Sequence, residues 1–189
     1  MKTIDRKTEI VTISAKLFRQ KGFSAVSMRD IALALDIKAA SLYNHIKSKQ
    51  EILVLIIIDI AKEFTQSINA IAKSKNTSLT KLEKLIEQHI DITLRNADAM
   101  ACLNNDWMHL PDDELKAYIK MRNEYEEKFR KIVKAGIASG EIKNLNVEVI
   151  IFSLLSTLRT LYLWYGKKSA LNIELLKADM TKALLKGIV

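Results

Sequence analysis

The sequence has few of the residues that break or turn a chain. Its 189 residues include five Gly and one Pro, and no stretch alternates apolar and polar residues as a strand does. Hydrophobic residues make up 49% and charged residues 28%, which is typical of a folded chain and excludes a disordered one. We therefore expect an all-α protein.

Cysteine is also scarce. Cys102 is the only one, so no internal disulfide forms, as in proteins of a reducing cytoplasm. A buried thiol is favoured here over a redox sensor. Charged residues at the N-terminus leave no apolar signal segment, and we expect a cytoplasmic location.

Signatures of catalysis are missing too. The three histidines are scattered, and there is no HxxxH, CxxC, Gly-rich phosphate loop or nucleophile motif. His109 with Asp112 and Asp113 could hold a metal, but a solvated loop beside Pro111 is the favoured interpretation. We expect no enzyme activity, no metal and no cofactor.

One apolar stretch is long enough to cross a membrane. Residues 147–165 contain Arg159 and four Ser or Thr residues, however, which favours a buried helix of a globular protein. No membrane partner is expected.

Positive charge is in excess and is unevenly placed. The net charge is +8, and residues 1–50 hold ten Lys or Arg against four Asp or Glu, a local excess of six. Such an excess suits a polyanion, although a solvated basic face would look the same.

Residues 27–51 predict a helix-turn-helix. Ser27 with Asp30 forms a capping box at the start of one short helix, and Asp36 suits the left-handed turn after it. A second helix over residues 39–46 turns Leu42 and Ile46 inward. In such a motif the second helix enters the DNA major groove.

At these residues the chain resembles the TetR family of transcriptional regulators. The resemblance covers about residues 6–60 and is carried by Leu17-Phe18, Lys21-Gly22-Phe23, the run from Ser27 to Ala32, Ser41 to Ile46, and Ser48-Lys49. Asp36 stands where Gly is common, and Lys38 where a capping Ser or Thr is common. The domains implied are 1–50 for DNA binding (family-type domain 6–66, motif 27–46) and 51–189 for effector binding and dimerisation.

The predicted recognition surface divides by residue type. Hydroxyl, imidazole and ammonium groups suit phosphates, and this set contains Ser41, Tyr43, His45, Lys47 and Lys49. Ser27 is also expected among the DNA-binding residues. Base edges suit Lys38, Ala39, Ala40 and Asn44. The resemblance implies backbone contacts for Tyr43 and Lys49. Tyr43 could instead be a core ring, and His45 could only cap or pack.

Five further helices are expected: residues 48–74, 78–95, 98–108, 111–139 and 146–166, with a last helix over 171–187. Ser153, Ser156, Thr157 and Thr160 form a small-residue stripe that permits close approach of another helix. With Leu176, Met180, Ala183 and Leu184 they predict a homodimer interface, the alternative being a monomeric core. TetR-like proteins dimerise through their last helices, which favours the homodimer interface over the monomeric core.

The resemblance also implies an inducer pocket in the C-terminal helices. Candidate lining residues are His89, Cys102, Trp107, Met108, Tyr118, Met121, Arg122, Tyr125, Arg159, Tyr162 and Trp164. Arg159 in apolar surroundings needs a partner, either a protein carboxylate or an anionic ligand. The C-terminal region loosely resembles the C-terminal domains of TetR-family members that respond to fatty acids or acyl-CoA thioesters.

These observations predict a homodimeric, sequence-specific DNA-binding regulator, a repressor released from its operator by a small molecule. The alternatives are a DNA-binding regulator without such a switch, or a helical enzyme.

Overall fold

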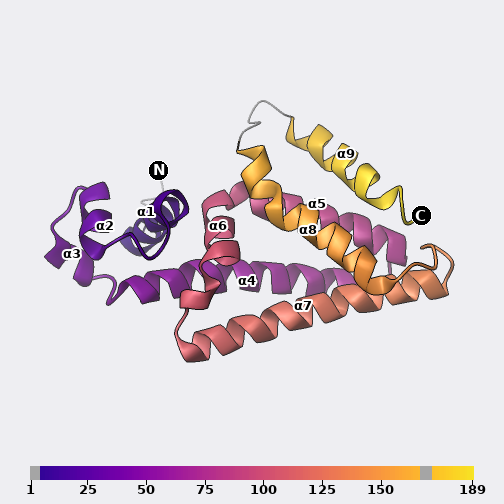
Figure 1. Cartoon of the computed structure of the whole chain (residues 1–189), viewed down its shortest axis with the longest axis horizontal. Helices are drawn as coiled ribbons and strands as arrows, with labels where there is room; N and C mark the ends of the chain where they lie inside the picture. The colour runs from indigo at the N-terminus through magenta and orange to yellow at the C-terminus, as the bar shows by residue number, and fades with distance from the viewer. Residues whose placement is uncertain (1–4, 167–171) are drawn as a thin grey trace. The chain divides into compact units, whose positions relative to one another are not determined.

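The computed structural model describes residues 5–166 and 172–189, and in these ranges the regular secondary structure is helical (Figure 1). The elements in chain order are α1 (Arg6–Lys21), α2 (Met28–Ala34), α3 (Ala39–Tyr43), α4 (Lys49–Lys73), α5 (Ser78–Arg95), α6 (Ala97–Asn105), the 3-10 helix η1 (Trp107–His109), α7 (Asp112–Ala138), α8 (Val147–Tyr165) and α9 (Ile173–Leu185). The all-α prediction is confirmed.

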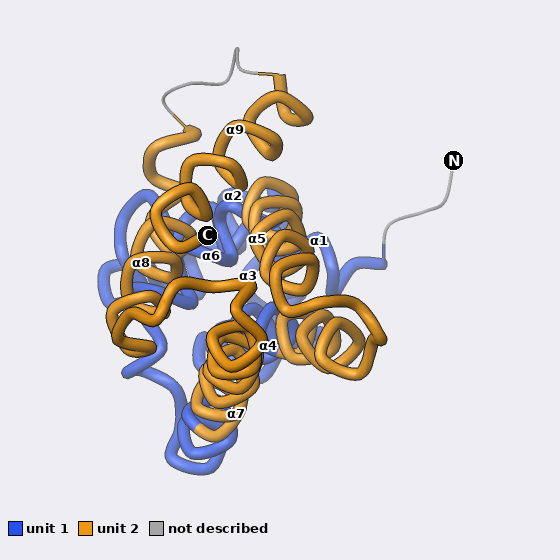
Figure 2. The backbone as a smooth tube through the Cα atoms, turned by 90° about the vertical axis from the view of Figure 1, so that its right-hand side faces the viewer, with its two compact units in different colours: residues 1–61, 96–119 blue, residues 62–95, 120–189 orange. Residues whose placement is uncertain are grey.

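The helices form two compact units, coloured separately in Figure 2. Unit 1 comprises residues 1–61 and 96–119, and unit 2 comprises residues 62–95 and 120–189. This division differs from the predicted boundary at residue 50, because α4 runs unbroken through that point and the α6–η1 segment packs against α1.

Unit 1 is built around the inner face of α1. Ile10 and Phe18 are buried, and α1 ends at Gly22, whose φ of 82° is the left-handed conformation that glycine adopts freely. The Cys102 thiol lies 3.8 Å from the Ala15 carbonyl, and Arg19 pairs with Asp98 at 2.9 Å. The α6 helix is thereby attached along α1.

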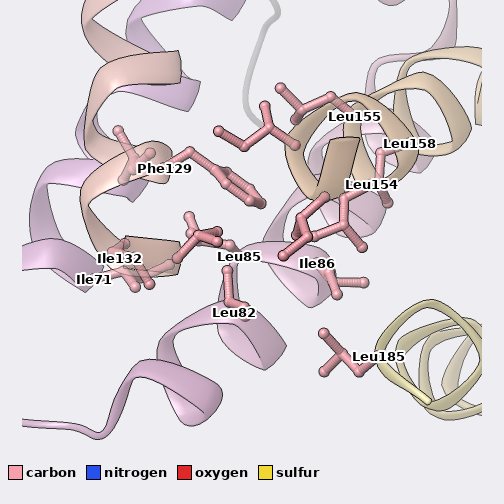
Figure 3. Packing of buried hydrophobic residues seen from close by; sticks show 14 of the residues in the cluster. Ile71, Leu82, Leu85, Ile86, Phe129, Ile132, Leu154, Leu155, Leu158 and Leu185 are labelled. Atoms are coloured by element: carbon pink, nitrogen blue, oxygen red, sulfur yellow. The ribbon is translucent and has the colours of Figure 1, made fainter. Parts of the chain in front are cut away.

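Unit 2 is a bundle with one apolar core. Figure 3 shows the Phe129 ring of α7 pointing toward leucines of α8, Ile132 beside Ile71, and Leu82 of α5 below them. The α5 helix packs against both α8 and α9. Burying large apolar side chains stabilises such a bundle by about 1.5–3 kcal/mol each.

A close approach fixes the end of α7. A Cβ atom on Gly136 would lie 2.9 Å from the Ser78 Cβ, so only glycine lets α7 pass the start of α5 at this distance. The helix ends before Gly140, which has a φ of 77°, as the sequence predicts. The Glu141 carboxylate then accepts the Leu79 N–H at 2.9 Å and caps α5.

The two sides of α8 differ. Leu154, Leu158 and Leu161 are buried in the core of unit 2, whereas Val149, Phe152 and Leu163 are exposed. By length and composition alone this helix could cross a membrane. Its buried leucine side is that of a core helix, which agrees with the interpretation from sequence.

Candidate nucleic-acid interface and effector site

The start of α2 is fixed by the predicted capping box. The Ser27 hydroxyl accepts the Asp30 N–H at 3.2 Å, and the Asp30 carboxylate accepts the Ser27 N–H at 2.8 Å. The Ser27 hydroxyl also donates to the Asp30 carboxylate, and this hydrogen bond, followed by that from the Ser27 N–H, lowers the pKa of Asp30. Ser27 therefore has a capping role inside the domain.

The turn that orients the recognition helix is also as expected. Asp36 has a φ of 52°, the left-handed conformation that Asp tolerates better than most residues. The Ile37 N–H then donates to the Ala32 carbonyl at 3.0 Å, which returns the chain against α2.

The α3 helix presents one polar face and one buried face. Leu42 and Ile46 are fully buried, as predicted, and they anchor the element in unit 1. The candidate DNA-contacting residues that are exposed are Lys38, Ala40, Tyr43, Asn44, His45 and Lys47; Ala39 and Ser41 are half-buried. Tyr43 is 53% exposed, so it is not a core ring. The imidazole of His45 is exposed as well.

The helical part of this element is shorter than predicted. The α3 helix ends at Tyr43 and not at Ile46, and Lys38 provides no side-chain cap at its start. Asn44 and His45 lie in the turn after α3, held by 3-10-type hydrogen bonds to Ser41 and Leu42. They remain exposed beside the helix.

Lys49 makes contacts inside unit 1. Its ammonium donates to the carbonyls of Phe23 at 2.8 Å and Val26 at 2.7 Å and lies 4.3 Å from the centre of the Phe23 ring. A third carbonyl, that of Ser24, lies at 3.4 Å. An ammonium has three N–H donors, so these internal contacts engage the Lys49 ammonium, and its phosphate contact stays a prediction.

The candidate effector residues of unit 2 include a buried histidine. His89 is 4% exposed, and neither imidazole nitrogen has a hydrogen-bond partner among the described residues. Burial lowers the pKa of His89 to about 3, with a smaller effect from Arg159, so the imidazole is neutral. The Phe64 ring lies 4.6 Å from it.

Other polar groups of the predicted set lie in the same unit. Arg159 pairs with Glu126 at 2.6 Å, so of the two partners considered the protein provides a carboxylate. Burial raises the pKa of Tyr125, whose ring packs edge-on against Phe64. Tyr162 is buried, and Met121 and Arg122 are half-buried on α7.

Five predicted pocket residues are placed elsewhere. Cys102, Trp107, Met108 and Tyr118 belong to unit 1, and Trp164 is 46% exposed on α8. Burial raises the pKa of the Cys102 thiol to about 12, so it is an inert packing group. Trp107 and Tyr118 pair with each other, and Met108 is 54% exposed.

The predicted dimer residues fall into an exposed group and a group packed within their own protomer. Ser153, Thr157 and Thr160 are exposed on α8, Ser156 is half-buried, and Ala183 is exposed on α9. Leu176 is buried in its own protomer, and Met180 and Leu184 pack against the core of unit 2. A role of these three in a dimer interface stays a prediction, whereas Ile173 and Leu175 of α9 are exposed.

A groove separates α5 from α9. It has a volume of about 550 Å³, and Leu79 and Leu185 are among its apolar lining residues. Glu83 and Glu87 from α5 and Lys182 and Lys186 from α9 add charges of both signs. None of these residues belongs to the predicted effector set.

Some residues of these sites were not predicted from sequence. Phe64 falls at helical spacing from Ile57, Ile60 and Ile68, which indicates burial but gives no sign of its neighbour His89. Asp106 accepts the Phe23 N–H and His109 stacks on the Phe23 ring. No sequence signal joins residues more than eighty positions apart.

Comparisons with known proteins agree with this geometry. Residues 10–56 match the family of bacterial regulatory proteins called tetR, and residues 75–188 match the tetracyclin repressor-like C-terminal domain. The chain therefore belongs to the TetR family of transcriptional regulators. DNA binding, ligand binding and dimer formation are typical of this family.

Individual relatives extend over the whole chain. The transcriptional repressor KstR2 of Rhodococcus jostii is 25% identical over 185 residues, which cover 97% of this chain and 91% of the relative. The ketosteroid transcriptional regulator KstR2 of Mycobacterium tuberculosis has the same fold, with a TM-score of 0.92 at 19% identity over 100% of this chain and 97% of the other. AibR, solved with isovaleryl coenzyme A and operator DNA, shares the fold with a TM-score of 0.81 at 19% identity over 95% and 97%.

Proposed function

We propose that this protein is a homodimeric repressor that binds operator DNA through α3 and is released by a small-molecule effector in unit 2. The observation that carries the proposal is the exposed polar face of α3 above the buried Leu42 and Ile46. A recognition element of this kind enters the major groove and reads base edges. The cytoplasm, where DNA is found, is the expected location.

The effector part of the proposal rests on His89. A buried polar group without a hydrogen-bond partner destabilises a fold by about 1–3 kcal/mol, so the imidazole suits a site that a ligand completes. Neutral histidine donates one hydrogen bond and accepts another. A ligand carbonyl accepts the hydrogen bond from the imidazole N–H, and a ligand hydroxyl pairs with either nitrogen. An apolar chain on the same ligand suits the Phe64 ring beside His89.

Among small molecules, a fatty acid or an acyl-CoA thioester has this combination of an apolar chain and a polar carbonyl. AibR was solved with such a thioester, isovaleryl coenzyme A. A regulator without a small-molecule switch is the second candidate. In a regulator of that kind, nothing would offset the destabilisation caused by the unpartnered His89 imidazole.

The first experiment is fluorescence anisotropy with DNA selected by the wild-type protein from a random library, at near-physiological salt. A preference of ~10³ or more over unselected DNA of equal length would establish a specific regulator. Absence of any preference would overturn the proposal.

The same complex then serves to test the effector. Titration with isovaleryl-CoA, longer acyl-CoAs and free fatty acids is expected to release the DNA, and His89→Ala is expected to weaken that response without changing the affinity for DNA. Exposed Lys120 on α7 provides the control variant Lys120→Ala. If no compound of these classes changes DNA affinity, the acyl hypothesis fails, whereas the DNA-binding function stands.

A further inference from the structure

The turn between α1 and α2 is held by groups from two other elements. This turn, residues 22–26, contains Phe23, which is only 5% exposed. Phe18 of α1 packs edge-on against the Phe23 ring at 5.1 Å, and the His109 imidazole stacks on it at 5.2 Å with an interplanar angle of 25°. The Phe23 N–H donates to the Asp106 carboxylate.

The same turn is bound by the first residue of α4. Lys49 donates to the carbonyls of Phe23 and Val26 and places its ammonium over the Phe23 ring. Phe23 is therefore contacted through its N–H, its carbonyl and its ring. Its partners come from α4 and from the segment 106–109.

The position of this turn determines where the recognition helices begin. Val26 is followed directly by Ser27, the capping residue of α2, and α3 follows after one short turn. A shift of the turn must move α2 and α3 with it, because α2 has only seven residues. Asp106 and His109, more than eighty positions later in the chain, thus help to set the position of α2 and α3.

The segment that carries these two residues has a particular place in the chain. Residues 96–119 belong to unit 1, whereas α5 before them and most of α7 after them belong to unit 2. The segment is thus joined along the chain to α5 on one side and to α7 on the other. The Arg19–Asp98 pair and the Cys102–Ala15 contact attach its first half to α1.

We propose that Asp106 and His109 are positioning residues for DNA recognition, acting on α2 and α3 through the Phe23 turn. They touch no DNA themselves in this proposal. It rests on the proposed function, because its effect is read as sequence preference in DNA binding.

The test compares Asp106→Ala and His109→Ala with Met108→Ala, a matched control at the exposed position between them. Binding to the selected DNA is expected to weaken about five- to tenfold in the first two variants, from the loss of one aromatic or hydrogen-bonded contact. Met108→Ala is expected to bind as the wild type does. The salt dependence should not change, because no phosphate contact is lost.

A purely structural role would give a different result. It would lower the melting temperature of the two variants and leave the ratio of selected to random DNA affinity unchanged at a temperature where all variants are folded. That unchanged ratio would overturn the proposal. Asp106→Asn, whose amide oxygen still accepts the Phe23 N–H, is expected to keep most of the ratio.

Hydrogen exchange separates this proposal from the function on which it rests. In His109→Ala and Asp106→Ala, the amides of α2 and α3 are expected to exchange faster than in the wild type, and those of α5 are not. Should the wild-type protein show no DNA preference, the proposed function fails. The positioning role then stands or falls with the exchange result, and unchanged protection of α2 and α3 rejects it.

Discussion

At the level of single residues, long side chains take partners far away in the sequence. Lys49 and Arg159 both illustrate this: each bonds a group more than twenty positions away, the first three carbonyls and the second Glu126. The partners of Lys49 are backbone carbonyls, and the partner of Arg159 is the half-buried carboxylate of Glu126. These contacts add to the stability of the tertiary structure.

For Lys49 this leads to a sharp prediction. Lys49→Met keeps the aliphatic stem but leaves the carbonyls of Phe23 and Val26 without their donor, so we expect the free energy of unfolding to fall by about 2 kcal/mol. Urea denaturation measures that loss. The slope of DNA affinity against salt should stay as in the wild type, and a slope reduced by about one would establish the predicted phosphate contact of Lys49.

His89 gives the protein a stability that depends on pH. Its folded pKa of about 3 lies below the ordinary value of 6.5, so the unfolded chain binds the proton more readily. Stability is then fully present above pH 6.5 and is lost as the pH falls below that value. From pH 7 to pH 5 one such group costs about 2 kcal/mol.

His89→Gln isolates this contribution, because glutamine does not titrate. Urea midpoints of wild type and variant at pH 7 and pH 5 should show a smaller loss in the variant. The carboxylates, including Glu51 and Glu148 with their lowered pKa values, are common to both proteins and cancel in the comparison. Equal losses would place a proton-accepting partner at His89 in the folded state.

At the level of elements, local signals predicted most helix ends. The capping box at Ser27, the left-handed Asp36 and the helix end before Gly140 each involve residues within four positions, where spacing determines geometry. Such signals did not give the length of α3. Its last turn tightens after Tyr43, and only five residues separate it from the start of α4 at Lys49.

The same contrast holds for the two candidate sites. The exposed face of α3 could be predicted, because Leu42 and Ile46 fix which side is buried. The effector set could not, since its members come from separate helices and four of the eleven belong to unit 1. The part of α9 in an interface likewise stays a prediction, because apolar periodicity marks a buried face without saying what buries it.

The α3 region should separate base reading from phosphate binding. Asn44→Ala is expected to relax preference at one or two base pairs, at a cost of about 1–3 kcal/mol on the best sequence. Selection from a random library would reveal the relaxed positions. Lys47→Ala should instead weaken binding to all sequences alike and reduce the salt slope by about one. Identical changes in sequence preference would contradict this division of the surface.

At the level of the whole molecule, the outer side of α8 has to be covered for the proposed function. Phe152 is 72% exposed and Leu163 52%, and the small side chains of Ser153, Thr157 and Thr160 lie on the same helix. Large exposed apolar side chains beside small ones suit a second helix at close range. A symmetric pair of α8 helices would cover the patch on both protomers at once.

Phe152→Glu tests this arrangement. A carboxylate in each copy of a symmetric contact meets its own equivalent, so sedimentation should show a dimer for the wild type and a monomer for the variant. Met108→Glu, an exposed apolar residue of unit 1, is the control and should remain dimeric.

Loss of the dimer should also change DNA binding in a defined way. Two heads on half-sites about one helical turn apart bind the second half-site as an intramolecular step, which raises affinity by ~10²–10⁴. Phe152→Glu should lose that factor on a full operator and bind an isolated half-site as the wild type does, since α3 is untouched. If the variant is monomeric and still binds the full operator with wild-type affinity, one head is enough for recognition, and a dimeric repressor is the wrong assembly for this protein.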